Sequence, residues 1–405
     1  ILKRGRDESL RRFHPWVFSG AIADVQGNPS EGDLVSVHAS DGECLAYGHF
    51  QVGSIAVRVL SFDDSALSPG FWEVMLSRAL QVRVSTGLHH MSDSTGVSEA
   101  SREISTNCYR LVHGEGDNLP GLIIDYYDGV CVIQAHSVGM FRAKKQISDA
   151  LQKVYGPDLK AVYDKSSGTA PFKAGLELVD GYLYKKEGFN DDEQIVIENG
   201  QKFMVNWTEG QKTGFFLDQR DNRALVGQMA KGRNVLNLFC YTGGFSIYAL
   251  ANGAEHVDSV DSSKKAMMMV DKNVALNGFD ESKHTSLCCD AIDYLKNAPE
   301  GKYDLMIVDP PAFAKHRGAL KNALRAYQRL NAAAISKVAP GGYVFTYSCS
   351  QVVDKEAFAL AVFSAAAQCG RSVRILDRLN QPCDHSVNIY HPEGEYLKGL
   401  LLYVE

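Results

Sequence analysis

The stretch Val235–Phe245, which reads VLNLFCYTGGF, decides the fold of this 405-residue chain. An apolar strand ends in a polar turn with two adjacent glycines, and a helical pattern begins directly after them. Apolar strands and helical stretches then alternate as far as Cys369, which predicts a doubly wound α/β domain. The expected strands are Val235–Phe239, His256–Val260, Tyr303–Val308 and Tyr343–Tyr347, followed by a terminal pair at Val373–Asp377 and Leu400–Val404.

The sequence before this domain predicts two further parts. Residues 1–80 show short strands and a two-residue hairpin signal at Asp41–Gly42, so we expect a small β-barrel or roll. Residues 81–190 mix strands with a helix, which predicts a central α+β domain, and a Ser-, Thr- and Gly-rich loop covers residues 86–103. The third part, residues 191–405, opens with a hairpin whose turn is Asn199–Gly200.

The overall composition is that of a globular protein. Apolar residues make up 45% and charged residues 22%, and no apolar run approaches the ~20 residues that span a bilayer. Nine cysteines without a C-x-x-C pair predict a reducing, cytoplasmic location and no structural zinc. A net charge of −6 does not indicate a nucleic-acid binder, so RNA contact must be argued from local patches.

A nucleoside site is predicted at the carboxyl ends of the first two strands of the third part. Gly243 and Gly244 allow a tight turn and close approach to a ligand, and Asp261, at the end of the next strand, can accept hydrogen bonds from ribose hydroxyls. The chain has neither the dinucleotide fingerprint nor a Walker lysine at this place, and S-adenosylmethionine fits what remains. The alternative is an ordinary Gly-Gly turn with Asp261 as a helix N-cap, and these two features alone do not decide between them.

The following strand ends add a base site and a nucleophile. In Asp309–Phe313, which reads DPPAF, proline carbonyls can hold a flat amino-bearing base and Phe313 can stack on it. Cys349 follows the next strand in Ser348–Ser350, so its thiol would lie on the same rim as Asp309. The alternatives are a proline-capped strand end and a bystander cysteine, which most of the other eight cysteines must be.

These motifs together resemble a known family. Four of them, FCYTGGF at 239–245, DPPAF at 309–313, SCS at 348–350 and KTGFFLDQR at 212–220, resemble the RlmI-type bacterial large-subunit ribosomal RNA methyltransferases, which form 5-methylcytosine. HPWVFSG at 14–20 and GDLVSV at 32–37 are similar to the PUA domain of that family. GEGDNLPG at 114–121 is similar to its middle domain.

The resemblance implies a Rossmann-like class I methyltransferase domain at 191–405, a β-rich PUA-like RNA-binding domain at 1–80 and a central α+β domain at 81–190. It also implies S-adenosylmethionine as cofactor, ribosomal RNA as partner, no metal, no membrane, and a homodimer. The cofactor contacts that it implies are Phe216, Asp218, Gln219, Arg220, Phe239, Tyr241, Thr242, Gly243, Gly244, Asp261, Ser262, Asp290 and Ala291.

Two basic patches are candidates for RNA contact. The first is a stripe spaced four residues apart on a predicted helix beside the base site. With its surroundings, the predicted substrate contacts there are Pro310, Pro311, Phe313, Lys315, Arg317, Lys321 and Arg325, and Arg329 continues the stripe. The second patch interleaves Lys3, Arg4, Arg6, Arg11 and Arg12 with Phe13, Trp16 and Phe18. The alternative for each patch is a solvated face.

The expected reaction is methyl transfer to C5 of a cytosine, with Cys349 adding to C6 and Asp309 bonding the ring. Ala312 holds no second thiol, so the sequence assigns no base for removal of the C5 proton. One alternative is an N-methyltransferase that acts on a guanine or an exocyclic amine and needs no cysteine. The other is a non-catalytic PUA-type RNA-binding protein.

Overall fold

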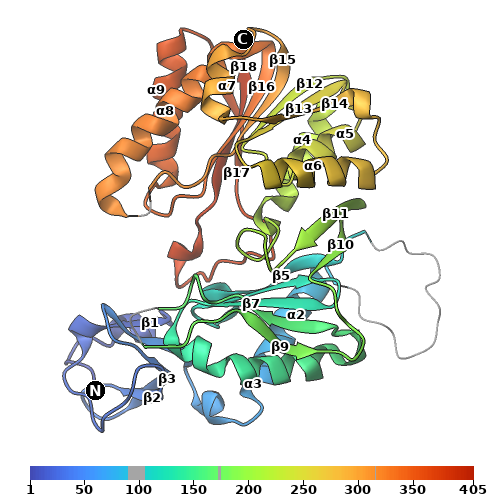
Figure 1. The fold of residues 1–405 in the computed structure, drawn as a ribbon. Helices are drawn as coiled ribbons and strands as arrows, with labels where there is room; N and C mark the ends of the chain where they lie inside the picture. Colours follow the sequence, from blue (N-terminus) through green and yellow to red (C-terminus); the bar gives the residue numbers. More distant parts are fainter. Residues whose placement is uncertain (90–104, 172–174, 315) are drawn as a thin grey trace. The chain divides into compact units, whose positions relative to one another are not determined.

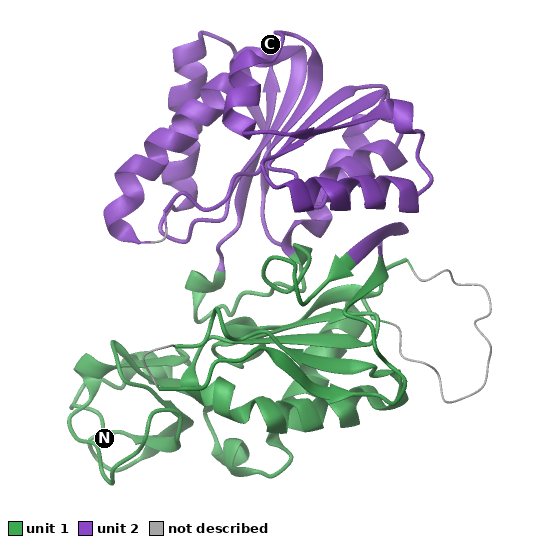
Figure 2. Ribbon diagram, in the orientation of Figure 1, with its two compact units in different colours: residues 1–196, 205–217, 383–394 green, residues 197–204, 218–382, 395–405 purple. Residues whose placement is uncertain are grey.

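The computed structural model describes residues 1–89, 105–171, 175–314 and 316–405, which form two compact units (Figure 2). Unit 1 comprises Ile1–Val196, Val205–Leu217 and Cys383–Gly394, and unit 2 comprises Ile197–Met204, Asp218–Pro382 and Glu395–Glu405. Each unit is therefore built from segments far apart in the sequence. Most of the loop predicted over 86–103, and Lys315, lie outside the described residues.

The N-terminal part of unit 1 is the predicted β-rich domain. An antiparallel sheet in the order β1-β4-β3-β2 follows the short helix α1 (Glu8–Arg11). Its strands are β1 (Trp16–Phe18), β2 (Leu34–His38), β3 (Cys44–Phe50) and β4 (Ile55–Ser61). Its small core contains Leu2, Leu10, Val17, Val37, Ala46, Val57 and Val59.

A second sheet in unit 1 has the order β5-β6-β7-β8-β9 (Figure 1). Helices α2 and α3 share one core with this sheet, in which Leu76 of α2 and Ile147 of α3 are fully buried. Because α2 begins within residues 1–80, the three-part division of the chain stays a prediction. The elements are α2 (Phe71–Ser85), β5 (Cys108–His113), β6 (Leu122–Tyr127), β7 (Val130–Ala135), α3 (Val138–Tyr155), β8 (Ala161–Asp164) and β9 (Gly181–Lys185).

Unit 2 is the predicted doubly wound domain, with seven strands in the order β14-β13-β12-β15-β16-β18-β17. Helices α4, α5 and α6 lie on one side of the sheet, and α8 and α9 lie on the other (Figure 1). The strands are β12 (Asn234–Leu238), β13 (His256–Asp261), β14 (His284–Cys288), β15 (Tyr303–Val308), β16 (Val338–Ser348), β17 (Val373–Leu379) and β18 (Lys398–Val404). The helices are α4 (Arg220–Ala230), α5 (Gly244–Ala251), α6 (Lys264–Leu276), α7 (Ala291–Asn297), α8 (Leu320–Lys337) and α9 (Lys355–Cys369).

The predicted hairpin is formed by β10 (Glu193–Glu198) and β11 (Gln201–Asn206). Its turn residues Asn199 and Gly200 have φ of 48° and 81°, the left-handed values that an Asn-Gly hairpin turn requires. Three short elements of unit 2, α4, β14 and α7, were not predicted from the sequence. Within the described ranges, no helix is both long and apolar enough to cross a membrane.

His49 couples the stability of unit 1 to pH. The ring is 8% exposed, it stacks on Trp72 at 6.3 Å, and a Cβ on Gly139 of α3 would come within 2.2 Å of it. Burial lowers the pKa of His49 from 6.5 to about 4, because the charged imidazolium would lose its hydration. The neutral form thus contributes stability that is present above pH 6.5 and is lost as the pH falls towards 4.

We expect acidification from pH 7.5 to 5 to lower the free energy of unfolding of unit 1 by about 2 kcal/mol through His49 alone. Urea titrations followed by tryptophan fluorescence measure this, because Trp16, Trp72 and Trp207 all lie in unit 1. His49→Gln should flatten the pH dependence, and His38→Gln on strand β2 gives the background. Equal slopes in His49→Gln and the wild type would contradict this account.

Candidate functional site

The parallel register brings four strand ends to one edge of the sheet. Leu238 of β12 lies opposite both Val260 of β13 and Val308 of β15, and Val308 lies opposite Thr346 of β16. The loops that follow these strands carry the glycine pair, Asp261, Asp309 and Cys349. All four predicted features therefore leave the sheet at the same edge, as the sequence predicts.

The glycine loop has an unusual backbone. Phe239, Tyr241 and Gly243 have φ of 57°, 48° and 82°, so three of five consecutive residues are left-handed. A Cβ on Gly243 would lie 3.0 Å from Val270, and a Cβ on Gly244 would lie 2.9 Å from Arg223 Cδ. Both glycines are needed here, the first for its conformation and both for the close contacts. Left-handed non-glycine residues cluster at ligand sites, where the surroundings hold the strain.

Asp261 fixes this loop. Its Oδ2 accepts the N–H of Tyr241 at 3.0 Å, and its Oδ1 accepts the N–H of Ser263 at 2.9 Å. The N-cap of α6 is Ser263, whose hydroxyl accepts the N–H of Ala266. The alternative interpretation of Asp261 as a helix N-cap is therefore wrong, and a carboxylate with further acceptor directions stands beside the glycine turn.

Asp290 caps helix α7. One carboxylate oxygen, Oδ1, accepts the N–H groups of Ile292 and Asp293, both at 2.9 Å. Strand β14 pairs with β13 so that Cys288 lies opposite Asp261, which places Asp290 two residues beyond that edge. Ser262 and Ala291 are the neighbours of the two aspartates in the chain. The cofactor contacts predicted for Asp290, Ser262 and Ala291 stay predictions.

The segment before α4 contacts Asp309, which belongs to the predicted base site. Gln219 is 4% exposed, and its Nε2 donates to Asp309 Oδ2 at 2.9 Å. The buried Asp218 accepts the hydroxyl of Tyr396 at 2.6 Å, and Arg220 begins α4 with 2% exposure. Phe216 belongs to unit 1, whereas these three residues belong to unit 2. Tyr396 carried no motif and was missed by sequence reasoning.

The loops that carry Asp309 and Cys349 are tied together through Tyr327 of α8. The Ser348 hydroxyl donates to the Tyr327 oxygen at 2.9 Å, and the hydroxyls of Tyr327 and Ser350 are 3.1 Å apart. The Ser350 hydroxyl also accepts the N–H of Ala314 at 3.4 Å. The helical spacing of Tyr327 with Leu320, Leu324 and Leu330 predicts a residue that faces the core, but it does not predict a hydroxyl contact.

Phe313 packs on the same tyrosine, with ring centroids 4.7 Å apart and planes inclined at 52°. Pro310 is buried, Pro311 is exposed and Phe313 is half-buried. Phe313 is thus held by Tyr327 of α8, but the contact of Phe313, Pro310 and Pro311 with a base stays a prediction.

Burial separates Cys349 from Cys240, which also follows a strand of this sheet. Cys240 is 7% exposed with its Sγ 3.7 Å from Met267 Sδ, and burial raises its pKa well above the ordinary value. Cys349 is half-buried at the edge that Asp309 shares. Burial also raises the pKa of Cys131, in the core of unit 1. Of these cysteines, Cys349 has the accessibility that a nucleophile requires.

The stripe on α8 has the predicted orientation. Lys321, Arg325 and Arg329 of α8 are all exposed, and so is Arg317, which lies in the short 3-10 turn Arg317–Ala319 before the helix. On the opposite face of the helix, Tyr327 and Leu330 are buried in the core of unit 2. The helix is therefore amphipathic and presents a row of cations to solvent.

The N-terminal patch is weaker than its sequence suggests. Arg11 donates to Asp7 and Glu43, both at 2.6 Å, and Arg12 donates to Glu8 at 2.5 Å. Three carboxylates thus compensate two of its five cations, whereas Arg4 and Arg6 are exposed. Phe13 and Phe18 are 48% and 46% exposed. The half-buried Trp16 lies under Arg58 at 5.3 Å and donates to Glu115 at 2.8 Å, so its ring is partly used inside unit 1.

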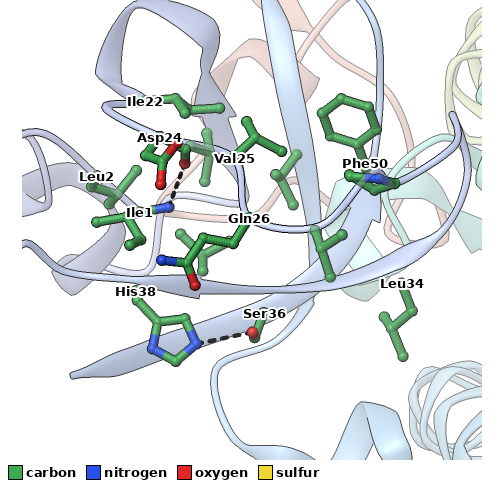
Figure 3. A pocket seen from close by; sticks show the side chains of 15 residues that line it. Ile1, Leu2, Ile22, Asp24, Val25, Gln26, Leu34, Ser36, His38 and Phe50 are labelled. Carbon is green, nitrogen blue, oxygen red and sulfur yellow. Dashed lines mark hydrogen bonds between the residues drawn. The ribbon is translucent and has the colours of Figure 1, made fainter. Parts of the chain in front are cut away.

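The N-terminal domain also has a hollow of about 330 Å³ beside β2 (Figure 3). Its labelled lining is mainly apolar, with Ile1, Leu2, Ile22, Val25, Leu34 and Phe50 around Asp24, Gln26, Ser36 and His38. None of the residues predicted for catalysis, cofactor binding or RNA contact lines it, so it adds nothing to the predicted site.

Comparison with known proteins gives a consistent result over the whole chain. Residues 186–401 match the family model of S-adenosylmethionine-dependent methyltransferases, and residues 1–62 match that of PUA-like domains. The ribosomal RNA large subunit methyltransferase I of Aeromonas hydrophila is 39% identical, over 99% of this chain and 98% of its own length. The protein of the same name from Pseudoalteromonas translucida is 38% identical over 99% and 98%.

Solved structures confirm the fold. SMU.776, a putative methyltransferase crystallised with SAH, has a TM-score of 0.81 at 22% identity and covers 98% of both chains. A putative SAM-dependent methyltransferase from Streptococcus mutans has a TM-score of 0.80 at 22% identity, over 100% of this chain and 99% of its own. The class I methyltransferase fold, the PUA-like N-terminal domain and the S-adenosylmethionine cofactor are thereby confirmed.

We expect Asp261→Asn to weaken S-adenosylmethionine binding about 10- to 100-fold, because a charge-assisted hydrogen bond contributes about 1.5–3 kcal/mol. The amide keeps one acceptor for the loop N–H groups, so the unit should stay folded. Titration calorimetry measures the affinity. Asp280→Asn is the matched control, since Asp280 only accepts hydrogen bonds from Ser282 at the other end of β14. Unchanged affinity in Asp261→Asn would remove this residue from the site.

Proposed function

Because the chain belongs to the family of S-adenosylmethionine-dependent methyltransferases that includes the ribosomal RNA large subunit methyltransferases I, we propose that it methylates C5 of a cytosine in large-subunit ribosomal RNA. The observation that carries the proposal is the half-buried Cys349 at the strand end next to that of Asp309, on the edge that also holds the glycine loop. A thiol at this place has no function in simple methyl transfer to an amine, but it is required to activate C5.

The residues present fit the proposed cofactor site. We assign the left-handed turn Tyr241–Gly244 to the cofactor, and Asp261 beside it can bond ribose hydroxyls. Asp218 and Gln219 precede α4, Arg220 begins it, Asp290 precedes α7, and we assign these residues to the cofactor as well. When bound, S-adenosylmethionine supplies an electrophilic methyl group.

Cys349 makes the cytosine reactive. Its thiolate adds to C6, which turns C5 into an enamine-like carbon that can take the methyl group. The C5 proton then leaves, and the electron pair of the C5–H bond re-forms the C5–C6 double bond as Cys349 departs as a thiolate. One cysteine thus forms and breaks the single covalent bond to the base.

Asp309 holds the ring during addition. Its carboxylate accepts the amide of Gln219 on Oδ2, which fixes the carboxylate orientation at the strand end. The other oxygen of Asp309, when it carries a proton, donates a hydrogen bond to the ring nitrogen N3, which stabilises the negative charge that develops there as the thiolate adds to C6. Gln219 therefore orients Asp309 in the proposed reaction, a role that the sequence did not suggest.

Ribosomal RNA is the proposed partner, with contacts at the exposed α8 stripe and at Arg4 and Arg6 of the N-terminal domain. The PUA-like match and the names of the relatives support this proposal. A cytoplasmic location follows from this substrate, and the homodimer stays a prediction from the family resemblance.

We expect Cys349→Ala to abolish methylation, because C5 is not nucleophilic without the thiol adduct. S-adenosylmethionine affinity should stay within about threefold of the wild type. Tritium transfer to ribosomal RNA measures the activity, and bisulphite sequencing identifies the modified cytosine. Cys383→Ala removes an exposed thiol in unit 1 and is the matched control.

RNA that carries 5-fluorocytosine should trap a covalent complex with the wild type, because fluorine cannot leave C5 as a proton does. The Cys349→Ala protein should form none. Methylation by Cys349→Ala at a rate comparable with the wild type would exclude the C5 reaction and favour an N-methyltransferase.

We expect Arg4→Ala combined with Arg6→Ala to weaken RNA binding and to reduce the slope of log affinity against log salt by about 1.5, because each phosphate contact contributes about 0.7–0.9. Arg11→Ala combined with Arg12→Ala should change the slope less, since carboxylates already pair with these residues. Fluorescence anisotropy at several KCl concentrations measures both. Equal effects of the two pairs would contradict the assignment of the patch.

A further inference from the structure

Lys398, the first residue of β18, is a buried cation at the nucleophile loop. It is 6% exposed and lies opposite Ser348 in the antiparallel pairing of β16 with β18. Its ammonium donates to the carbonyl oxygens of Ser350 and Val353, both at 2.6 Å. These two carbonyls belong to the loop that begins at Cys349, so the lysine holds the loop from inside the unit.

Burying an ammonium is costly, and two neutral carbonyls compensate it only in part. An apolar side chain at this place would leave the carbonyls of Ser350 and Val353 without their donor. The charge of the ammonium can also act on the loop, and the group in that loop that becomes negative during the proposed reaction is the Cys349 thiol.

The anions near Lys398 are few and otherwise engaged. Burial lowers the pKa of Lys398 to about 8, while Cys349, Asp354 and Glu395 act in the opposite direction and Lys355 adds to the lowering. Glu395 pairs with Lys355. Asp354 is the N-cap of α9 and accepts a backbone N–H at 2.7 Å.

Tyr327 is the titratable group that faces the loop from α8. Burial raises its pKa, so its hydroxyl is neutral at physiological pH. Tyr327 therefore orders the loop through Ser348 and Ser350 without contributing charge, whereas Lys398 contributes charge. A change at Tyr327 therefore alters the position of the loop without altering its charge, whereas the charge depends on Lys398.

We propose that Lys398 is a positioning residue whose buried ammonium fixes the Cys349 loop and stabilises the Cys349 thiolate, both before addition to the base and after elimination. The thiol proton passes to water before attack, and Lys398 stays protonated throughout. This inference rests on the proposed function, since it gives Cys349 the role of nucleophile.

The test is the pH dependence of Cys349 alkylation by iodoacetamide in the full-length protein without RNA. Mass spectrometry must follow the Cys349 peptide, because Cys44, Cys288, Cys289 and Cys383 are exposed and also react. Lys398→Gln keeps a donor for the carbonyls and removes the charge. We expect it to raise the apparent pKa of Cys349 by one unit or more, which lowers the thiolate fraction at pH 7 about tenfold.

Two further variants separate charge from structure. Lys398→Arg keeps the charge and should restore the alkylation profile to within about threefold of the wild type. Tyr327→Phe loosens the loop but keeps the charge, so it should leave the apparent pKa of Cys349 unchanged. If Lys398→Gln does not fold, Lys398→Met takes its place, and S-adenosylmethionine affinity reports the integrity of each variant.

The proposal is overturned if Lys398→Gln, or Lys398→Met in its place, has the wild-type alkylation profile. It is also overturned if Tyr327→Phe shifts the profile as much as the loss of the charge does. The methylation rate is measured separately, and its acid limb should move to higher pH in Lys398→Gln. If the alkylation profile shifts as expected but Cys349→Ala still methylates RNA, the electrostatic effect stands and the cytosine-C5 reaction fails.

Discussion

The site depends on the register of the parallel strands, which makes four of them end at the same edge of the sheet. Leu238, Val260, Val308 and Thr346 are register partners across β13, β12, β15 and β16, so each loop begins from the same height in the sheet. A slip of one residue in any pairing would turn that strand's side chains to the opposite face. The glycine turn, the two carboxylates and the thiol can therefore cooperate only because backbone hydrogen bonds align them.

A buried ion pair lies next to the glycine turn. Arg223 of α4 donates two bonds to Glu198 of the hairpin, at 2.8 and 2.7 Å, and Tyr248 of α5 donates to the same carboxylate at 3.0 Å. The Arg223 side chain also fills the space that a Cβ on Gly244 would need. The glycine is thus required by the packing of the ion pair, and removing either charge would leave the other buried and unpaired.

The periodicity of strands and helices predicted most of the fold. The residues at the strand ends predicted which side chains lie at the shared edge of the sheet. Cys349 was separated from Cys240 by such reasoning, and the burial of Cys240 agrees with it. Contacts between distant segments could not be predicted in this way. The bond between Gln219 and Asp309, the hydroxyl contacts of Tyr327 and the place of Lys398 need the three-dimensional packing of α4, α8 and β18. Charge patterning overstated the N-terminal patch, because Glu43 is far from Arg11 in the sequence but bonded to it in the fold.

The position of β18 between β16 and β17 has a consequence for how the protein is made. Strand β17 is bonded to β18 and not to β16, although it follows β16 in the sequence. During synthesis β17 therefore emerges without a partner strand, and one edge of β16 stays open until residues 398–404 follow. The same late segment brings Lys398 to the loop of Cys349. A nascent chain therefore completes its sheet and places Lys398 against the Cys349 loop in one step, and a shorter translation product exposes two strand edges to aggregation.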